Sequence, residues 1–355
     1  MRTSGVEHII LLSLVILSLL ATIASADHPD LQQASSITPK EHQRGPEQTF
    51  LTFPEWFLVH SPAEYATFVK DQPPSEFPFI GHIKQLWQSY GAVYGATRNK
   101  YPFNFGYHVM IVVISTSTTV EYLLRSAYET LIGRVSALTR THGTTEEDLL
   151  AARVAQNYVD FIRVRPFYEY NFFGDLVSLW KEPSFVGPDM FRKWERRYAL
   201  TTEYLTKAIY GWFIKKATQA SYDLALDVTA VVINRLPADI DGELPQFKVL
   251  ESFPDGSALV TVPRYDAFKV YSIALAKRGI EFQEIAGNRS VILVSALVPR
   301  EWAPGDDGAE VLFTQPILTQ PSLKRVALIV SVAELANLLR RLDDSGLVIE
   351  HVYDY

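Results

Sequence analysis

The chain has 355 residues, of which 48% are hydrophobic and 21% charged, and its formal net charge at pH 7 is −7. This composition is that of a packed protein, and it argues against a disordered chain and against a polytopic transporter. The acidic balance argues against nucleic acid as a partner, because phosphate binding needs clustered positive charge. The sequence contains no cysteine, which excludes disulfides, thiolate nucleophiles and cysteine-ligated metals. We therefore expect a fold that core burial alone holds together, with no metal and no cofactor.

The first 26 residues have the pattern of an export signal. Arg2 precedes an apolar run from Ile9 to Ile23, and Ala24-Ser25-Ala26 provides small residues before the polar Asp27. A basic start, an apolar stretch and a small-x-small site are the parts of a secretory signal peptide. The run has about 15 residues, fewer than the roughly 20 of a comfortable membrane span, yet it could also stay as an anchor. Either way, we expect an exported protein of the cell membrane or of a periplasm-like envelope compartment.

Residues 27–49 are polar and proline-containing, and we expect them to form a flexible leader. Residues 50–222 follow as a domain of five or six helices. Capping boxes predict helix starts at Ser61 and Thr144, because a glutamate follows each of them three residues later. The other expected helices run over about 80–96, along an apolar stripe from Val113 to Leu138, from Pro166, and from Pro188 to about Tyr222.

Residues 107–124 leave two interpretations open. The segment is apolar with a run of serine and threonine, whose hydroxyls can bond to helix carbonyls inside a membrane. His108 and Glu121 would then lie near its two ends. The apolar stripe also continues past Arg125 to Leu138, as it would in a buried core helix. The sequence is therefore compatible with a membrane span or with a core helix.

Residues 223–355 form a second domain of a different class. β-branched and alternating segments predict strands near 228–233, 248–253, 257–262, 280–286, 290–297, 309–314, 325–331 and 347–353. Two helices, at about 265–278 and 333–342, end before Gly279 and Gly346, which suit helix C-caps. The order strand, helix, glycine, strand occurs twice, which indicates duplicated β-α-β units. The fold class expected for the whole chain is α+β: an N-terminal all-α domain, then a ferredoxin-like sandwich in which both units share one sheet.

Aromatic residues concentrate between Phe50 and Tyr107, in runs such as Phe53-Pro54-Glu55-Trp56-Phe57. Aromatic side chains can fill a small helical core, and they can also line a groove for an apolar ligand. For the second case the candidate ligand-binding residues are Trp56, Phe57, Trp87 and Tyr107.

Histidines with nearby carboxylates are the weak candidates for chemistry. His60, His82 and His108 lie in or next to the aromatic segment, and imidazoles that converge with a carboxylate can relay protons. The candidate partners are Glu55, Glu64 and Glu121. No phosphate loop, His-Glu-x-x-His or Gly-x-Ser-x-Gly motif is present, and this favours a non-catalytic protein.

Basic residues on the last long helix are candidates for membrane contact. Arg192-Lys193-Trp194-Glu195-Arg196-Arg197 is the densest basic cluster, and Trp212 precedes Lys215 and Lys216. Basic and aromatic residues of this kind can lie on anionic lipid. The sequence-based candidates are therefore Arg192, Lys193, Arg196, Arg197, Trp212, Lys215 and Lys216.

These patterns support two hypotheses of function. The first is an exported, membrane-associated, non-catalytic binding or scaffolding module, with membrane lipid or an envelope protein as its partner. The second is an enzyme that acts on an apolar or lipid-like substrate within the aromatic helical domain. The sequence leaves the oligomeric state open.

Overall fold

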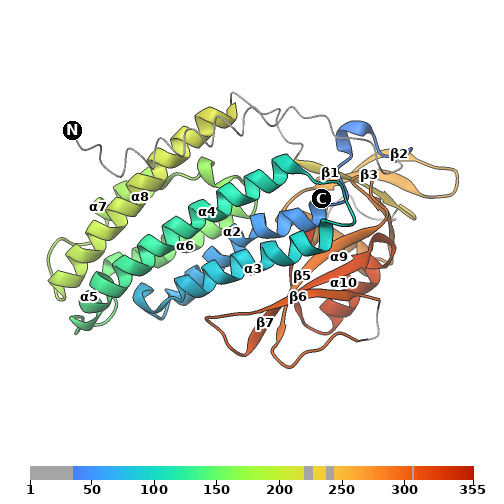
Figure 1. The fold of residues 1–355 in the computed structure, drawn as a ribbon. Helices are drawn as coiled ribbons and strands as arrows, with labels where there is room; N and C mark the ends of the chain where they lie inside the picture. The colour runs from blue at the N-terminus through green and yellow to red at the C-terminus, as the bar shows by residue number, and fades with distance from the viewer. Residues whose placement is uncertain (1–34, 220–226, 237–243, 306–307) are drawn as a thin grey trace. The chain divides into compact units, whose positions relative to one another are not determined.

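The computed structural model describes residues 35–219, 227–236, 244–305 and 308–355 (Figure 1). The segment expected to be a signal or anchor, 1–26, lies outside these ranges. The chain is α+β and divides into two compact units, each described by itself. The helical unit contains residues 57–84 and 104–219, and the α/β unit contains residues 35–56, 85–103 and the described part of 227–355. Residues 50–56 and 85–103, which we expected in the helical domain, therefore belong to the α/β unit.

Most of the expected helices are present, with shifted ends. The helices up to residue 219 are α2 (Gln48–Phe68), α3 (Phe79–Thr97), α4 (Phe105–Tyr128), α5 (Arg134–Leu138), α6 (Glu146–Ile162), α7 (Phe172–Lys181) and α8 (Met190–Gln219). Short 3₁₀ turns occur at Lys40–His42, Pro74–Glu76 and Phe167–Glu169. A π-helical turn, Glu129–Gly133, joins α4 to α5 without a break.

The helix start predicted at Ser61 is wrong, because α2 begins thirteen residues earlier and runs through Pro62. A proline inside a helix removes one hydrogen bond, here to the carbonyl of Leu58, without always ending the helix. The Ser61 hydroxyl lies 2.9 Å from Nδ1 of His82 and 2.6 Å from the Tyr122 hydroxyl. At the start of α6, the cap is Thr145 rather than Thr144, and its hydroxyl accepts the Asp148 N–H.

The α/β unit contains eight strands in two separate sheets. The strands are β1 (Val228–Ile233), β2 (Lys248–Ser252), β3 (Ala258–Pro263), β4 (Phe282–Ile285), β5 (Val291–Pro299), β6 (Glu310–Pro316), β7 (Leu323–Ser331) and β8 (Val348–Tyr353). One sheet has the order β2-β3-β1-β4, the other β6-β7-β5-β8, and every pair is antiparallel. The single sheet expected for both β-α-β units is not formed, since each unit completes a four-stranded sheet of its own.

The two sheets contain matching elements. Helix α9 (Asp266–Lys277) joins β3 to β4, and α10 (Leu335–Asp344), after the 3₁₀ turn Val332–Glu334, joins β7 to β8. Both helices end in the same cap. Gly279 and Gly346 have φ values of +70° and +67°, and the next residue donates its N–H to a carbonyl five residues earlier, at 3.1 and 2.9 Å. This is the Schellman arrangement, and it favours glycine because a left-handed backbone strains other residues.

The two sheets share one core. Apolar residues from both sheets and from α9 and α10, among them Val260, Phe268, Val294 and Leu339, form one continuous buried cluster. The two helices pack against each other (Figure 1). Each repeat therefore contributes half of a common interior, which burial of aliphatic side chains stabilises.

Residues 35–56 cover other faces of the sheets, so from residue 35 onward the expected flexible leader is ordered. The Thr38 hydroxyl donates to Oε1 of Glu284 on β4 at 2.5 Å. Phe53 packs edge-on against Phe313 with ring centroids 4.8 Å apart, and Trp56 stacks on His351 at 3.5 Å. The aromatic segment therefore serves at these positions as core packing over the second sheet.

Substitution of Gly346 by alanine should destabilise the α/β unit by about 1–2 kcal/mol, the cost of a left-handed backbone for a residue with a Cβ atom. No atom lies within 4 Å of the added Cβ, so the cost is conformational. Chemical unfolding of the full chain measures it. Gly91→Ala is the control, because position 91 is helical and open and alanine there should add stability. Equal effects of the two substitutions would contradict the assignment of the cap.

Candidate functional site

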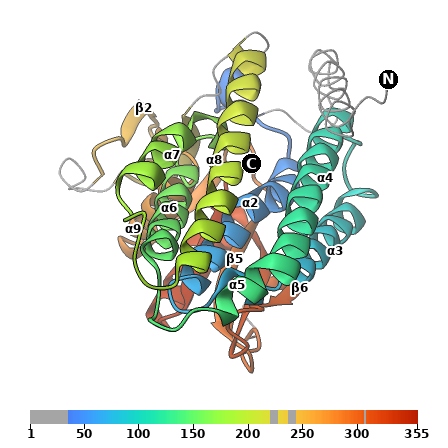
Figure 2. The ribbon, with the colours of Figure 1, turned by 90° about the vertical axis from the view of Figure 1, so that its left-hand side faces the viewer.

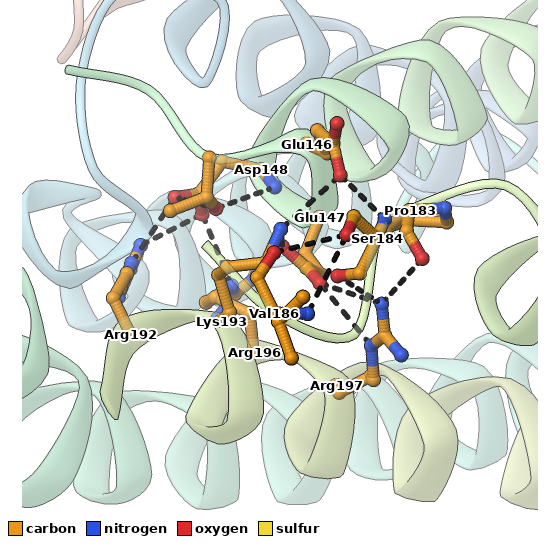
Figure 3. A network of polar contacts seen from close by, with 11 residues as sticks. Glu146, Glu147, Asp148, Pro183, Ser184, Val186, Arg192, Lys193, Arg196 and Arg197 are labelled. Atoms are coloured by element: carbon orange, nitrogen blue, oxygen red, sulfur yellow. Dashed lines mark hydrogen bonds and ion pairs between the residues drawn. The ribbon is translucent and has the colours of Figure 1, made fainter. Parts of the chain in front are cut away.

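Four basic residues of α8 lie inside the helical unit. Arg192, Lys193, Arg196 and Arg197 on α8 are 1–5% exposed, whereas we expected them on a solvent- or lipid-facing surface. They point toward the acidic first turn of α6 (Figure 3). The reason is charge complementarity, since Glu146, Glu147 and Asp148 follow one another there.

All four cations form ion pairs with this first turn, Arg196 through Asp148. Arg192 donates to both carboxylate oxygens of Asp148, at 2.8 and 3.1 Å. Arg197 donates twice to Oε1 of Glu147, at 2.9 and 3.1 Å. The Lys193 ammonium lies 3.2 Å from Glu146 and from Glu147. Paired, two-point contacts of this kind are the strong form of a charged hydrogen bond.

Arg196 connects the same network to the π-helical turn after α4. Its Nη1 donates to Oε1 of Glu129 at 2.9 Å, and its Nε lies 3.2 Å from Asp148. An added Cβ at the neighbouring Gly133 would lie 2.0 Å from Oε2 of Glu129, so any larger residue there would displace this carboxylate. The π-helical turn therefore places a buried carboxylate against α8.

A second charged cluster lies farther along α8. Lys207 pairs with Glu203 at 2.7 Å and with Glu121 at 3.3 Å. Arg125 of α4 lies 3.6 Å from both of these carboxylates and 4.4 Å above the ring of Tyr65. Glu121, a sequence-based candidate for acid–base chemistry, is thus neutralised by two cations.

The field of the arginines affects Asp148. Burial alone would raise the pKa of this carboxyl group, but the adjacent Arg196 and Arg192 outweigh burial and hold the pKa below its ordinary value. Asp148 therefore stays ionised, and the network keeps its charge at neutral pH.

The outer face of α8 is apolar. Every charged residue between Met190 and Ile214 is buried or half-buried, and the exposed large side chains are hydrophobic. They are Met190, Phe191, Trp194, Tyr198, Leu205, Ile209, Tyr210, Trp212 and Phe213. Beyond them, Lys215 and Lys216 are exposed. Of the basic candidates, only these two lie on the surface.

Helix α4 repeats this arrangement, and its continuation α5 differs in that Arg134 is exposed. From Phe105 to Gly133 every charged residue is buried or half-buried. The exposed apolar residues are Phe105, Val112, Val120, Leu123, Leu124, Leu131, Ile132, Val135 and Leu138. In Figure 2, α5 and the start of α8 lie side by side, and the two elements are in contact.

Among the described residues, the stretch Phe105–Leu138 is the one helix long and apolar enough to cross a membrane. It includes the segment 107–124 for which a span and a core helix were both left open. We name the outer faces of α4–α5 and α8 together the apolar surface of the helical unit.

The three candidate histidines, His60, His82 and His108, are all buried. His82 is fully buried, with its Nδ1 2.9 Å from the Ser61 hydroxyl and its Nε2 3.6 Å from Glu64. Its ring stacks on Phe77 at 4.6 Å. Contacts that lead from a serine to a histidine to a glutamate resemble a catalytic triad in residue types. Ser61, however, is only 1% exposed. The described residues include no group of three metal-binding side chains.

The candidate ligand-binding aromatics divide between the units. Trp56 and Trp87 belong to the α/β unit, and Phe57 and Tyr107 belong to the helical unit. Trp56 and Phe57 are buried, Tyr107 is half-buried, and Trp87 is 37% exposed.

Sequence reasoning missed the acidic partners of α8. These partners are Glu129, Glu146, Glu147 and Asp148. Glu195 of α8 itself also lies in the network and accepts hydrogen bonds from Tyr128 and Ser136. The sequence did contain a usable signal, because the four basic residues at 192–197 have a possible counterpart in the three consecutive acidic residues at 146–148.

No protein-family model, curated protein or solved structure matches this chain.

Replacing Arg197 by methionine should lower the free energy of unfolding by about 3–5 kcal/mol, because Glu147 would lose its main partner while fully buried. Chemical unfolding in detergent measures this. The control is Arg153→Met, which removes an exposed pair with Glu182 and should cost less than about 1 kcal/mol. The double variant Arg197→Met/Glu147→Leu should recover most of the loss. A double variant as unstable as the single one would contradict the buried-charge explanation.

The loop before α6 should loosen in acid through Asp189. This carboxylate accepts N–H bonds from Thr141 and His142, at 2.7 and 3.0 Å, and a hydroxyl bond from Thr141. These bonds lower its pKa to about 2. A lowered pKa stabilises the fold above the unfolded-state value of roughly 4, and this contribution disappears as the pH falls toward 2. In the Asp189→Asn variant, the free energy of unfolding should therefore fall less steeply between pH 5 and pH 2 than in the unmodified chain. An unchanged slope would contradict the role of Asp189.

Proposed function

We propose that this chain is an exported, membrane-associated, non-catalytic binding or scaffolding protein. In this proposal the apolar surface of the helical unit contacts the hydrocarbon of a lipid bilayer, and the α/β unit binds a partner. The observation that carries it is the reversed polarity of α8, which turns its charges inward and its hydrophobic residues outward.

The reversed polarity fits lipid better than water. In a water-soluble bundle, the charged face of an amphipathic helix points to solvent. In α8 the charges form ion pairs with α4–α5 and α6 instead, and charged residues at membrane depth are expected to face the bundle interior and to pair in this way. Extended apolar patches on a soluble monomer are uncommon, and they mark interaction surfaces.

The dimensions of α8 also suit a bilayer. Trp194 and Trp212 are 18 residues apart, which corresponds to about 27 Å along a helix. The hydrocarbon core of a bilayer is about 30 Å thick, and tryptophans gather at its two boundaries. Lys215 and Lys216 follow Trp212, where their ammonium groups could reach lipid headgroups. α6 differs, because its exposed residues include Glu146, Arg153, Asn157 and Asp160, so lipid contact is assigned to α4–α5 and α8.

For the α/β unit we infer two ferredoxin-like modules rather than one. The strand order β2-β3-β1-β4, with a helix between the third and fourth strands, is the order of a ferredoxin-like sheet. Edge strands such as β2, whose residues are all exposed, are suited to pairing with another chain. This supports a binding role, although fold alone does not define one.

The geometry gives less support to an enzyme. The approach of Ser61, His82 and Glu64 is the best arrangement for catalysis, but it is closed to a substrate as it stands. Neither of the two described clefts is lined by any of these three residues.

Tryptophan fluorescence of the full chain in bilayers tests the lipid contact. Brominated phosphatidylcholine should quench the emission, and Trp194→Phe and Trp212→Phe should each remove part of that quenching. Trp302→Phe, in the α/β unit, is the control and should remove none. Absence of quenching, or an equal loss of quenching in all three variants, would contradict the proposal. So would complete release of the chain by alkaline carbonate with an N-terminus at Asp27.

A further inference from the structure

A cleft of about 370 Å³ lies beside the hairpin of β6 and β7 in the α/β unit. Its walls are mainly aliphatic and proline side chains. They are Pro316, Ile317, Leu318, Pro321 and Leu323. Sites for small molecules commonly occupy roughly 300–1,000 Å³ and are largely apolar, so this cleft suits a short ligand.

The hairpin turn that forms the cleft is held by its own backbone. The Ile317 N–H donates to the Leu323 carbonyl at 3.1 Å, and the Leu323 N–H donates to the Gln320 carbonyl at 2.9 Å. The Ile317 side chain is only 4% exposed and anchors the turn in the unit. The cleft is therefore largely formed before any ligand arrives.

Thr314 and two cations, Arg300 and Lys324, complete the lining. The Arg300 N–H donates to the Ser322 carbonyl at 2.8 Å, which fixes this residue to the hairpin turn. The Lys324 ammonium donates to the Trp302 carbonyl at 2.6 Å. Within the described ranges, neither side chain forms an ion pair with a carboxylate, in contrast to the cations of α8. An apolar cleft with two positive charges and no acidic residue in its lining is complementary to an anion with an apolar tail.

We propose that this cleft binds a small anionic amphiphile, a carboxylate with an aliphatic chain of medium length. The chain would lie on Leu318, Leu323 and the two proline rings, and the carboxylate would face Arg300 and Lys324. This ligand class specifies the binding role proposed for the α/β unit and therefore depends on it. Guanidinium groups recognise carboxylates well because two parallel N–H groups meet two oxygens.

Octanoate is the probe. Octanol, which has the same chain length and no charge, is the control ligand. The full chain is held in phosphatidylcholine nanodiscs, and binding is followed by ligand-observed NMR against empty nanodiscs. Octanoate should bind saturably and more tightly than octanol. Arg300→Gln should weaken octanoate binding roughly tenfold or more, the scale of one charge-assisted hydrogen bond, and leave octanol unchanged. Lys324→Gln should act in the same direction.

Lys277→Gln removes an exposed charge from the same unit outside the cleft and should leave binding unchanged. Thermal unfolding of each variant shows whether the unit is folded. Non-saturable octanoate binding, equal binding of octanol, or an Arg300→Gln variant with wild-type affinity would overturn the ligand class. If tryptophan quenching still shows lipid contact in that case, only this inference fails and the membrane association stands.

Discussion

The structure of the helical unit depends on ion pairs between α8 and the acidic residues of α4–α5 and α6. Four cations within six residues of α8 are withdrawn from solvent, and their desolvation is tolerable only when carboxylates satisfy them at short range. This requirement fixes the rotation of α8 about its own axis. Once Arg192, Arg196 and Arg197 face inward, Phe191, Trp194 and Tyr198 have no other direction than outward. The apolar surface is thus a consequence of where the charges find partners.

The α/β unit is organised by a different principle. Its interior is a continuous hydrophobic cluster, its buried ion pairs are local ones such as Arg325 with Glu350, and its order comes from strand pairing and two equivalent glycine caps. The order strand, helix, glycine, strand occurs twice, and each occurrence completes its own hydrogen-bonded ladder and contributes one side to the common core. Thus one chain combines a unit ordered by electrostatics and a unit ordered by hydrophobic burial.

The sequence predicted the α/β unit well, because β-branched alternation and C-cap glycines are local signals. All eight strands lie close to the expected segments, and Gly279 and Gly346 have the expected left-handed backbone. The sheet partners could not be predicted, since pairing of β1 with β3 and β4 depends on contacts distant in sequence. At Ser61 a local rule failed, because the hydroxyl that would have capped a helix bonds instead with His82 and Tyr122.

The difference between local signals and contacts distant in sequence also applies to the candidate site. The density of basic residues in α8 was evident, but composition alone cannot tell on which side of a helix a charge finds its partner. Arg192 could lie on lipid or inside the bundle until Asp148, 44 residues away, is known to meet it. The apolar stripe of α4 was likewise visible, but its exposure was not.

Thr49 connects the beginning of the described chain to its last strand. Its hydroxyl donates to the carbonyl of Tyr353 on β8 at 2.7 Å and accepts the N–H of Leu293 on β5 at 2.9 Å. The Thr49 side chain thus bridges the backbones of two neighbouring strands, at residues that are sixty positions apart in the sequence. The second sheet cannot close around Thr49 until residue 353 has been synthesised, and contacts of such long range form slowly.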